Sequence, residues 1–284
     1  MQLTRRRANA GLVLLTVVWG TTFSIVHEAV QSFPPLALSA LRFGIATLAF
    51  APLLWRNRAE LRPTLKPGLV LGCLLFGGFA TQTLGLARTT PARAGFITGL
   101  SVVLVPMIGF VLGQRPPRRA LVGVTLAVVG LGVVSFGCRL PWLACAPLEA
   151  GASRAQIVGD LWVLACAVVY AFHIVGVSHW TTRHSPVCLN GIQIAVVAAL
   201  GLILTCLVDG APAAPSPRVL LAASFLGVVA TALVLTIWLT LQRYTTATHA
   251  ALIFALEPVF AAFFSWLWTG EAVTLAVWGG GALM

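Results

Sequence analysis

The stretch Leu86-Ala-Arg-Thr-Thr-Pro-Ala-Arg-Ala-Gly95 has a counterpart later in the chain, Leu241-Gln-Arg-Tyr-Thr-Thr-Ala-Thr-His-Ala250, which carries a one-residue insertion. Two further matches occur in the same order. Gly113-Gln114 lies opposite Gly270-Glu271, and Val17-Val-Trp-Gly20 lies opposite Val168-Val-Tyr-Ala171. The offset between paired positions stays within 151 to 157 residues, and self-similarity at a nearly constant offset indicates an internal duplication. The sequence therefore predicts two repeats, residues 1–140 and residues 150–284.

The composition places both repeats in a lipid bilayer. Of the 284 residues, 59% are hydrophobic and 9% are charged, whereas soluble proteins carry roughly 25% charged residues. Too few polar side chains remain to cover a surface that faces water. Ten crossings of about 20 residues would use roughly 200 residues and leave short connectors. This excludes a large domain outside the membrane.

Uncharged stretches predict ten membrane-spanning helices, five in each repeat, so the expected fold class is an all-α membrane protein. Only thirteen residues follow Glu271, fewer than the about 20 that cross a bilayer core. We therefore expect the tenth helix to be short or truncated. The predicted spans are residues 9–27, 35–55, 67–87, 91–113, 119–137, 157–178, 187–208, 218–241, 246–269 and 272–284.

The positive charges predict the orientation of these spans. Of the 18 Lys and Arg residues, twelve fall on the side of the N-terminus, five fall on the other side, and Arg42 lies within the second span. Because basic residues concentrate in cytoplasmic loops, we expect a multi-pass protein of the cell inner membrane with both termini in the cytoplasm.

The net charge of the chain is +11, but its basic residues form no basic helix and no aromatic-basic platform. This excludes nucleic acid as a partner.

An odd number of spans in each repeat has a topological consequence. After five crossings the chain is on the opposite side, so the second repeat must enter the membrane upside down relative to the first. Such inverted-topology repeats are typical of transporters in which a site between the halves opens to each side in turn. The predicted partners are a small-molecule substrate and the bilayer, and a single chain, a monomer, suffices for this arrangement.

These motifs resemble the drug/metabolite transporter superfamily, and within it the ten-helix EamA-type exporters. The resemblance implies a secondary transporter for amino acids, metabolites or drugs, and the chain is also similar to the YddG type of amino-acid exporter. It departs from the family pattern at Gln114, where the first repeat often has an acid, and in its incomplete tenth helix. The likeness is carried by Trp19-Gly-Thr-Thr-Phe23, Ala40-Leu-Arg-Phe43, Ala87-Arg-Thr-Thr-Pro-Ala-Arg-Ala-Gly95, the segment Ala250 to Phe260, which contains Glu257-Pro258, and Gly270-Glu271.

Polar and aromatic side chains in the middle of the spans indicate the lining of a path, because polar groups in hydrocarbon need a partner or water. Helical spacing places several of them on shared faces, and the repeats pair Trp19 with Tyr170 and Thr83 with Trp238. Ordinary helix packing and interfacial anchoring by aromatic residues are the alternative interpretation. The substrate-binding candidates are Trp19, Thr22, Phe79, Gln82, Thr83, Tyr170, His173, Trp238 and Gln242.

Two ionisable residues lie deep in predicted spans. Burial of the Glu257 carboxylate costs several kcal/mol unless it is paired, hydrated or protonated, so the residue is a candidate for proton coupling. A structural role beside Pro258 is the alternative, and it is favoured because the first repeat has only Ser101 at the matching place. Arg42 is a candidate for charge pairing with a carboxylate, or it could extend toward the surface.

Prolines suggest where the helices bend. Pro106 and Pro258 interrupt corresponding helices of the two repeats and are hinge candidates. No cofactor or metal site is expected, since no His or acid joins Cys138 and Cys145 at ligand spacing. Cys138 and Cys145 bracket a short connector, and either a disulfide or two free thiols is consistent with that spacing.

The sequence thus predicts an alternating-access exporter of small amphipathic solutes, amino acids or related metabolites. Export of cationic drugs by the same fold is one alternative. A channel and a lipid-modifying membrane enzyme belong to different classes, and the enzyme is disfavoured because no paired acids or hydrolase motif occurs. A nucleotide-binding Gly-Lys-Ser/Thr loop is also missing from the sequence, so the expected energy source is a solute or proton gradient.

Overall fold

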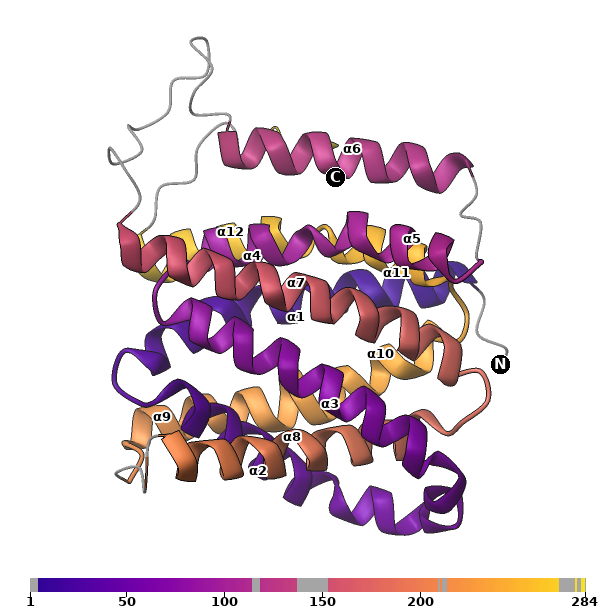
Figure 1. The fold of residues 1–284 in the computed structure, drawn as a ribbon, viewed down its shortest axis with the longest axis vertical. Helices are drawn as coiled ribbons and strands as arrows, with labels where there is room; N and C mark the ends of the chain where they lie inside the picture. Colours follow the sequence, from indigo (N-terminus) through magenta and orange to yellow (C-terminus); the bar gives the residue numbers. More distant parts are fainter. Residues whose placement is uncertain are drawn as a thin grey trace.

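The computed structural model describes residues 5–113, 118–136, 153–208, 210, 214–270, 279 and 282–283. The described chain is helical, and most of its helices run side by side along one direction (Figure 1). The helices are α1 (Arg5–Val30), α2 (Pro35–Arg56), the 3-10 turn η1 (Arg58–Glu60), α3 (Leu61–Leu86), α4 (Pro91–Gly99), α5 (Ser101–Val111), α6 (Arg118–Phe136), α7 (Arg154–Trp180), α8 (Pro186–Val208), α9 (Pro217–Phe225), the π-helical η3 (Leu226–Leu233), α10 (Val234–Gln242), α11 (Ala247–Phe254) and α12 (Glu257–Thr269).

The expectation of a multi-pass membrane protein is confirmed by eight segments of the described chain that are long and apolar enough to cross a bilayer. A ninth predicted span coincides with α6, whose apolar part, Ala120–Gly130, is shorter. The predicted tenth span lies outside the described residues except for three positions, as do Gln114, Cys138 and Cys145. The count of ten helices therefore stays a prediction.

The repeated stretch, residues 86–95 and residues 241–250, contains the start of a helix in both halves. Thr90 precedes α4 in an extended conformation, and its side chain accepts a hydrogen bond from the backbone N–H of Arg93. Thr246 does the same for the N–H of His249 at the start of α11. A Thr cap satisfies one of the free N–H groups of the first helical turn. Duplicated residues thus make duplicated local structure.

Both of these capped helices stop in mid-span and restart. The chain turns at Leu100 between α4 and α5, and at Ala255-Leu256 between α11 and α12. Pro258 follows the second break within the first turn of α12, where its missing N–H removes no helical hydrogen bond. The first break follows Gly99 and leaves Pro106 inside α5, so the hinge predicted at Pro106 stays a prediction. The second break places Glu257 at the beginning of a helix rather than in the middle of one.

The two halves of the chain pack closely against each other. Helix α3 lies against α7 and α8, α2 lies against α8, and α1 lies against α12. Glycines permit this approach: a Cβ atom on Gly68 would lie 2.8 Å from Ile192, and one on Gly72 would lie 2.7 Å from Val196. Small residues at such contacts let membrane helices gain close van der Waals packing.

Gly159 offers a direct test of the contact between α3 and α7. A Cβ atom there would lie 2.9 Å from the Cβ of Arg88 and 3.0 Å from the carbonyl oxygen of Gly85. We expect Gly159→Ala to lower the free energy of unfolding by about 1 to 3 kcal/mol, because backbone atoms must move. Gly44→Ala is the matched control, since nothing lies within 4 Å of its Cβ position. Thermal unfolding in detergent compares the two, and equal melting temperatures would contradict the packing described.

The halves also start at different ends of the bundle. In Figure 1, α1 begins at the right-hand end and α7 begins at the left-hand end. The turns between α1 and α2, between α3 and α4, and the start of α9 lie at the end where α7 begins. We call this the α7-start end, and we call the other the α1-start end.

Candidate functional site

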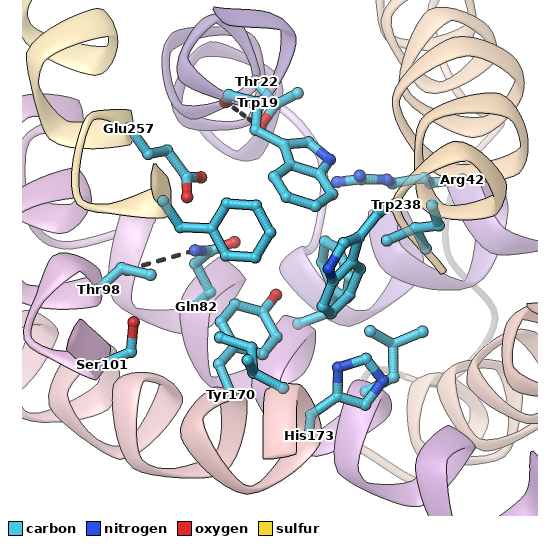
Figure 2. A pocket seen from close by; sticks show the side chains of 15 residues that line it. Trp19, Thr22, Arg42, Gln82, Thr98, Ser101, Tyr170, His173, Trp238 and Glu257 are labelled. Carbon is cyan, nitrogen blue, oxygen red and sulfur yellow. Dashed lines mark hydrogen bonds between the residues drawn. The ribbon is translucent and has the colours of Figure 1, made fainter. Parts of the chain in front are cut away.

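A cavity of about 70 Å³ lies inside the bundle, where helices from both halves of the chain meet. Fifteen side chains surround it, and Figure 2 shows how they converge. They come from α1, α2, α3, α4, α5, α7, α10, α11 and α12. The lining residues are Trp19, Thr22, Arg42, Leu75, Phe79, Gln82, Thr98, Ser101, Tyr170, His173, Ile174, Leu235, Trp238, Phe254 and Glu257.

Aromatic rings form one wall of this cavity. Trp19, Trp238 and Phe254 contact one another edge to face, with ring centroids 5.3 to 5.6 Å apart. The imidazole of His173 lies 5.4 Å from the ring of Trp238. Because edge-to-face packing is the favoured arrangement of aromatic pairs, the wall is a fixed surface against which an apolar group can rest.

The polar ends of these rings are bonded to protein groups. The indole N–H of Trp19 donates to the Ala230 carbonyl at 3.3 Å. The indole N–H of Trp238 donates to Oε1 of Gln242 at 2.8 Å. Such bonds hold each ring in one orientation, since buried N–H groups are costly when left unpaired.

Arg42 brings a positive charge to the same space from α2. Its side chain is buried, and its Nε–H donates to the hydroxyl of Thr231 at 2.8 Å. The guanidinium carbon lies 4.5 Å above the ring of Phe79 and 5.4 Å from that of Phe43. Stacking on aromatic faces and a fixed hydrogen bond orient the planar guanidinium.

The opposite side of the cavity is polar. The amide nitrogen of Gln82 donates to the hydroxyl of Thr98 at 3.4 Å. Ser101 and Glu257 lie nearby, and in Figure 2 the carboxyl group of Glu257 points toward the centre. These two residues open α5 and α12, directly after the two helix breaks, and they are the pair that the repeat alignment matches. The breaks therefore deliver polar side chains to the middle of two long apolar segments, Pro91–Val111 and Ala247–Trp268.

Nine of the residues singled out in the sequence line this cavity: Trp19, Thr22, Arg42, Phe79, Gln82, Tyr170, His173, Trp238 and Glu257. Thr83 and Gln242 do not. Thr83 lies behind the lining, where it donates to the Phe79 carbonyl and accepts from Ser39, and Gln242 lies behind Trp238. The hinge candidates Pro106 and Pro258 also lie outside the lining.

Sequence reasoning did not select six of the lining residues. Leu75, Ile174 and Leu235 lie within one helical turn of selected residues, so an extended search of the same faces would have found them. Thr98, Ser101 and Phe254 adjoin the helix breaks, and of these breaks only the second lies beside a proline, Pro258. Among the described residues no group of three or more His, Cys, Asp or Glu side chains could hold a metal ion.

The cavity is too small for an organic solute as it stands. Pockets for drug-sized ligands have volumes of about 300 to 1,000 Å³, far above the 70 Å³ found here. Entry of a larger molecule requires the helices around it to separate. The arrangement is that of a small, amphipathic site with an aromatic wall, a cation and a carboxyl group.

Comparison with known proteins places this chain in a family. The model of the EamA-like transporter family matches residues 7–136 and again residues 157–284. An uncharacterized transporter of Archaeoglobus fulgidus is 33% identical over 276 residues, which cover 95% of this chain and 80% of the relative. A probable amino-acid metabolite efflux pump of Salmonella typhimurium is 31% identical over 124 residues, 43% of this chain and 40% of the pump.

A solved crystal structure has the same fold, with a TM-score of 0.75 and 20% identity, covering 99% of this chain and 95% of that one. The closer likeness to the YddG type of exporter is not tested by these matches and stays a prediction. The two family matches cover most of the sequence, and together they confirm the resemblance inferred from its motifs. This chain belongs to the EamA-like transporter family, and with it to the drug/metabolite transporter superfamily.

Proposed function

We propose that this protein is a secondary transporter of the cell inner membrane that exports small amphipathic solutes, amino acids or related metabolites, by alternating access. The observation that carries the proposal is the buried cavity, whose lining comes from both segments that match the family model. A site between two halves can open to either side when the halves move. Relatives named as transporters favour a carrier over a membrane enzyme.

An inverted relation between the halves is part of the same proposal. It is supported by the opposite starting ends of α1 and α7 and by the matched breaks at Leu100 and Leu256. Ten helices with both termini in the cytoplasm complete the topology that we propose, in agreement with the distribution of Lys and Arg. On this topology the α7-start end faces away from the cytoplasm.

The lining supports an amino acid or a similar metabolite as substrate. Its aromatic wall suits an apolar side chain, while Arg42, Gln82 and Glu257 can hydrogen-bond or pair with charged groups. The Salmonella relative is named a probable amino-acid metabolite efflux pump. A cationic drug is the second candidate, because Glu257 and the rings could attract a cation.

Counterflow in proteoliposomes tests the proposal. Vesicles loaded with an unlabelled solute should take up the labelled solute transiently, and uptake should saturate and be inhibited by competitors. The panel contains aromatic and aliphatic amino acids, nucleosides and cationic drugs. Flux that rises linearly with concentration would indicate a channel instead, and a chemically altered solute detected by mass spectrometry would indicate an enzyme.

Glu257→Gln tests whether protons drive transport. Glu257 lines the cavity, and in the described part of the chain nothing is hydrogen-bonded to its carboxyl group, which favours coupling over a structural role. We expect the variant to lose the stimulation of uptake by an imposed pH gradient while counterflow continues, because exchange needs no net proton movement. Glu60→Gln, at the exposed turn η1, is the control. An unchanged response to the pH gradient would restore the structural interpretation.

A further inference from the structure

Arg42 is a buried cation whose charge lacks a counter-ion. Its side chain is 4% exposed, and the two ion pairs of the described residues, Arg93–Asp160 and Arg218–Glu28, both lie at the α7-start end. An isolated charge inside a membrane protein costs several kcal/mol unless an anion or water compensates it. Glu257 lines the same cavity but forms no ion pair with Arg42, so within the described residues the guanidinium has no acid at pairing distance and its charge calls for a further negative partner.

The geometry leaves the binding edge of the guanidinium free. Nε–H is bonded to Thr231, and one face lies against Phe79. Within the described residues no acceptor is bonded to either Nη amino group, and Arg42 lines the cavity beside the rings of Trp19 and Trp238 (Figure 2). A guanidinium binds a carboxylate through two parallel N–H groups, and it has no acceptor atoms of its own.

A π-helical segment fixes this geometry. Within η3, Ala230, Thr231 and Ala232 accept hydrogen bonds from three other helices: from Trp19 at 3.3 Å, from Arg42 at 2.8 Å and from Asn190 at 3.3 Å. A π-helical stretch is rare and is frequent at functional sites, since its altered register frees carbonyl groups for other partners. Thr231 thus acts as a positioning residue for the guanidinium.

We propose that Arg42 is the receptor for a carboxylate of the transported solute, oriented by Thr231, so that the cavity selects zwitterionic amino acids over amines of the same shape. This deepens the proposed function and rests on the cavity being the transport site. The carboxylate supplies the counter-ion that Arg42 lacks. The ammonium group then lies toward the aromatic wall and Glu257, which both attract cations.

Four compounds that share a benzyl group and differ in their charged groups test the proposal: L-phenylalanine, L-phenylalaninamide, 2-phenylethylamine and 3-phenylpropionate. The corresponding four compounds based on L-leucine form a second set. Binding to the full chain in nanodiscs is measured by calorimetry. We expect the amino acid of at least one set to bind and its amide and amine to bind at least tenfold more weakly. The proposal is overturned if amide or amine binds as well as the amino acid, or if neither amino acid binds.

Variants separate the receptor from general stability. Arg42→Gln should remove the preference for amino acid over amide, and Arg42→Lys should keep part of it. Thr231→Val should weaken binding of the amino acid severalfold without changing that of the amide, and Thr231→Ser should restore it. Arg58→Gln is the matched control, because Arg58, like Arg42, lies over an aromatic ring, in this case the indole of Trp55, but at the exposed surface. Arg42→Gln that folds and retains the preference would refute the assignment.

The outcome also separates this inference from the proposed function. Saturable counterflow of any solute, without dependence on its carboxylate, would leave the carrier intact and remove the role of Arg42. If Arg42→Gln does not fold, the probe series on the unmodified protein and the Thr231 pair still decide the question, because their ratio of amino-acid to amide binding does not depend on stability.

Discussion

Trp238→Ala should reduce counterflow at least tenfold. The indole is 4% exposed and contacts Trp19, Phe254 and His173, so its removal takes away the centre of the aromatic wall. Replacing a buried Trp by Ala costs about 3 to 5 kcal/mol in soluble proteins, and part of that loss here falls on the site itself. The neighbouring rings would collapse into the space, and a solute would lose its main apolar contact.

Trp238→Phe separates the contribution of the aromatic ring to transport from that of the indole hydrogen bond to Gln242. Phe keeps an aromatic face against Trp19 and Phe254 but cannot donate to Gln242. We expect intermediate flux, with a raised half-saturation concentration, because the ring is present but less firmly oriented. Counterflow and thermal unfolding are measured for both variants.

Trp162→Ala is the control for the loss of an indole from a membrane helix. Trp162 lies on α7 and is 39% exposed, outside the cavity lining. We expect its flux to stay close to that of the unmodified protein. If Trp238→Ala transports as well as this control, the aromatic wall is not part of the transport site.

The membrane spans could be predicted closely because lipid imposes a strong constraint. A helix that crosses hydrocarbon must be apolar along its length and satisfies its own backbone, so uncharged stretches alone set the boundaries. The span expected at residues 187–208 is helix Pro186–Val208, and the one expected at 35–55 is Pro35–Arg56. Both begin at a proline, which is favoured in the first turn.

Much of the site could also be predicted, because polar and aromatic residues in mid-span are rare enough to be informative. Trp19, Gln82 and His173 were selected on that basis and line one cavity. Thr83 and Gln242 share helical faces with lining residues, yet they lie in the layer behind. Spacing along a helix gives its faces, but only the packing of neighbouring helices decides which residue on a face reaches the cavity.

The first helix break and the π-helical segment could not be predicted, whereas Pro258 lies directly after the second break. Pro106 drew attention as a hinge, whereas the chain breaks beside Gly99. The segment Leu226–Leu233 contains no proline and reads as an ordinary apolar helix. Its register depends on bonds from Trp19, Arg42 and Asn190, which are distant in the sequence. Tertiary contacts of this kind override local propensity.

We expect Asp160→Asn to let helices α4 and α7 separate more often at the α7-start end of the protein. Asp160 on α7 forms an ion pair with Arg93 on α4 and accepts a hydrogen bond from Thr89 at 2.7 Å, so it joins the two halves. The side chains of Arg93 and Asp160 are 38% and 18% exposed. Loss of the pair should cost about 1 to 3 kcal/mol, between the values for exposed and buried pairs.

Cys166 provides the readout for this opening. Its thiol is buried, and it lies less than two helical turns from Asp160 on α7. With Cys166 as the single remaining cysteine, we expect Asp160→Asn to raise the rate of maleimide labelling and to lower the melting temperature. The ratio of the labelling rates of the variant and the unmodified protein then measures how much the Arg93–Asp160 pair stabilises the packed state of this end.

A charge swap makes the test specific. Arg93→Asp combined with Asp160→Arg should return labelling toward the original rate, whereas each single change should not, because only the pair restores opposite charges. Glu28→Gln is the matched control: its pair with Arg218 joins the halves at the same end, but the two side chains are 59% and 82% exposed. Water screens such a pair, so its loss should cost less than about 1 kcal/mol and leave Cys166 protected. If Glu28→Gln and Asp160→Asn raise labelling equally, closure of this end depends on its net charge and not on the Arg93–Asp160 contact.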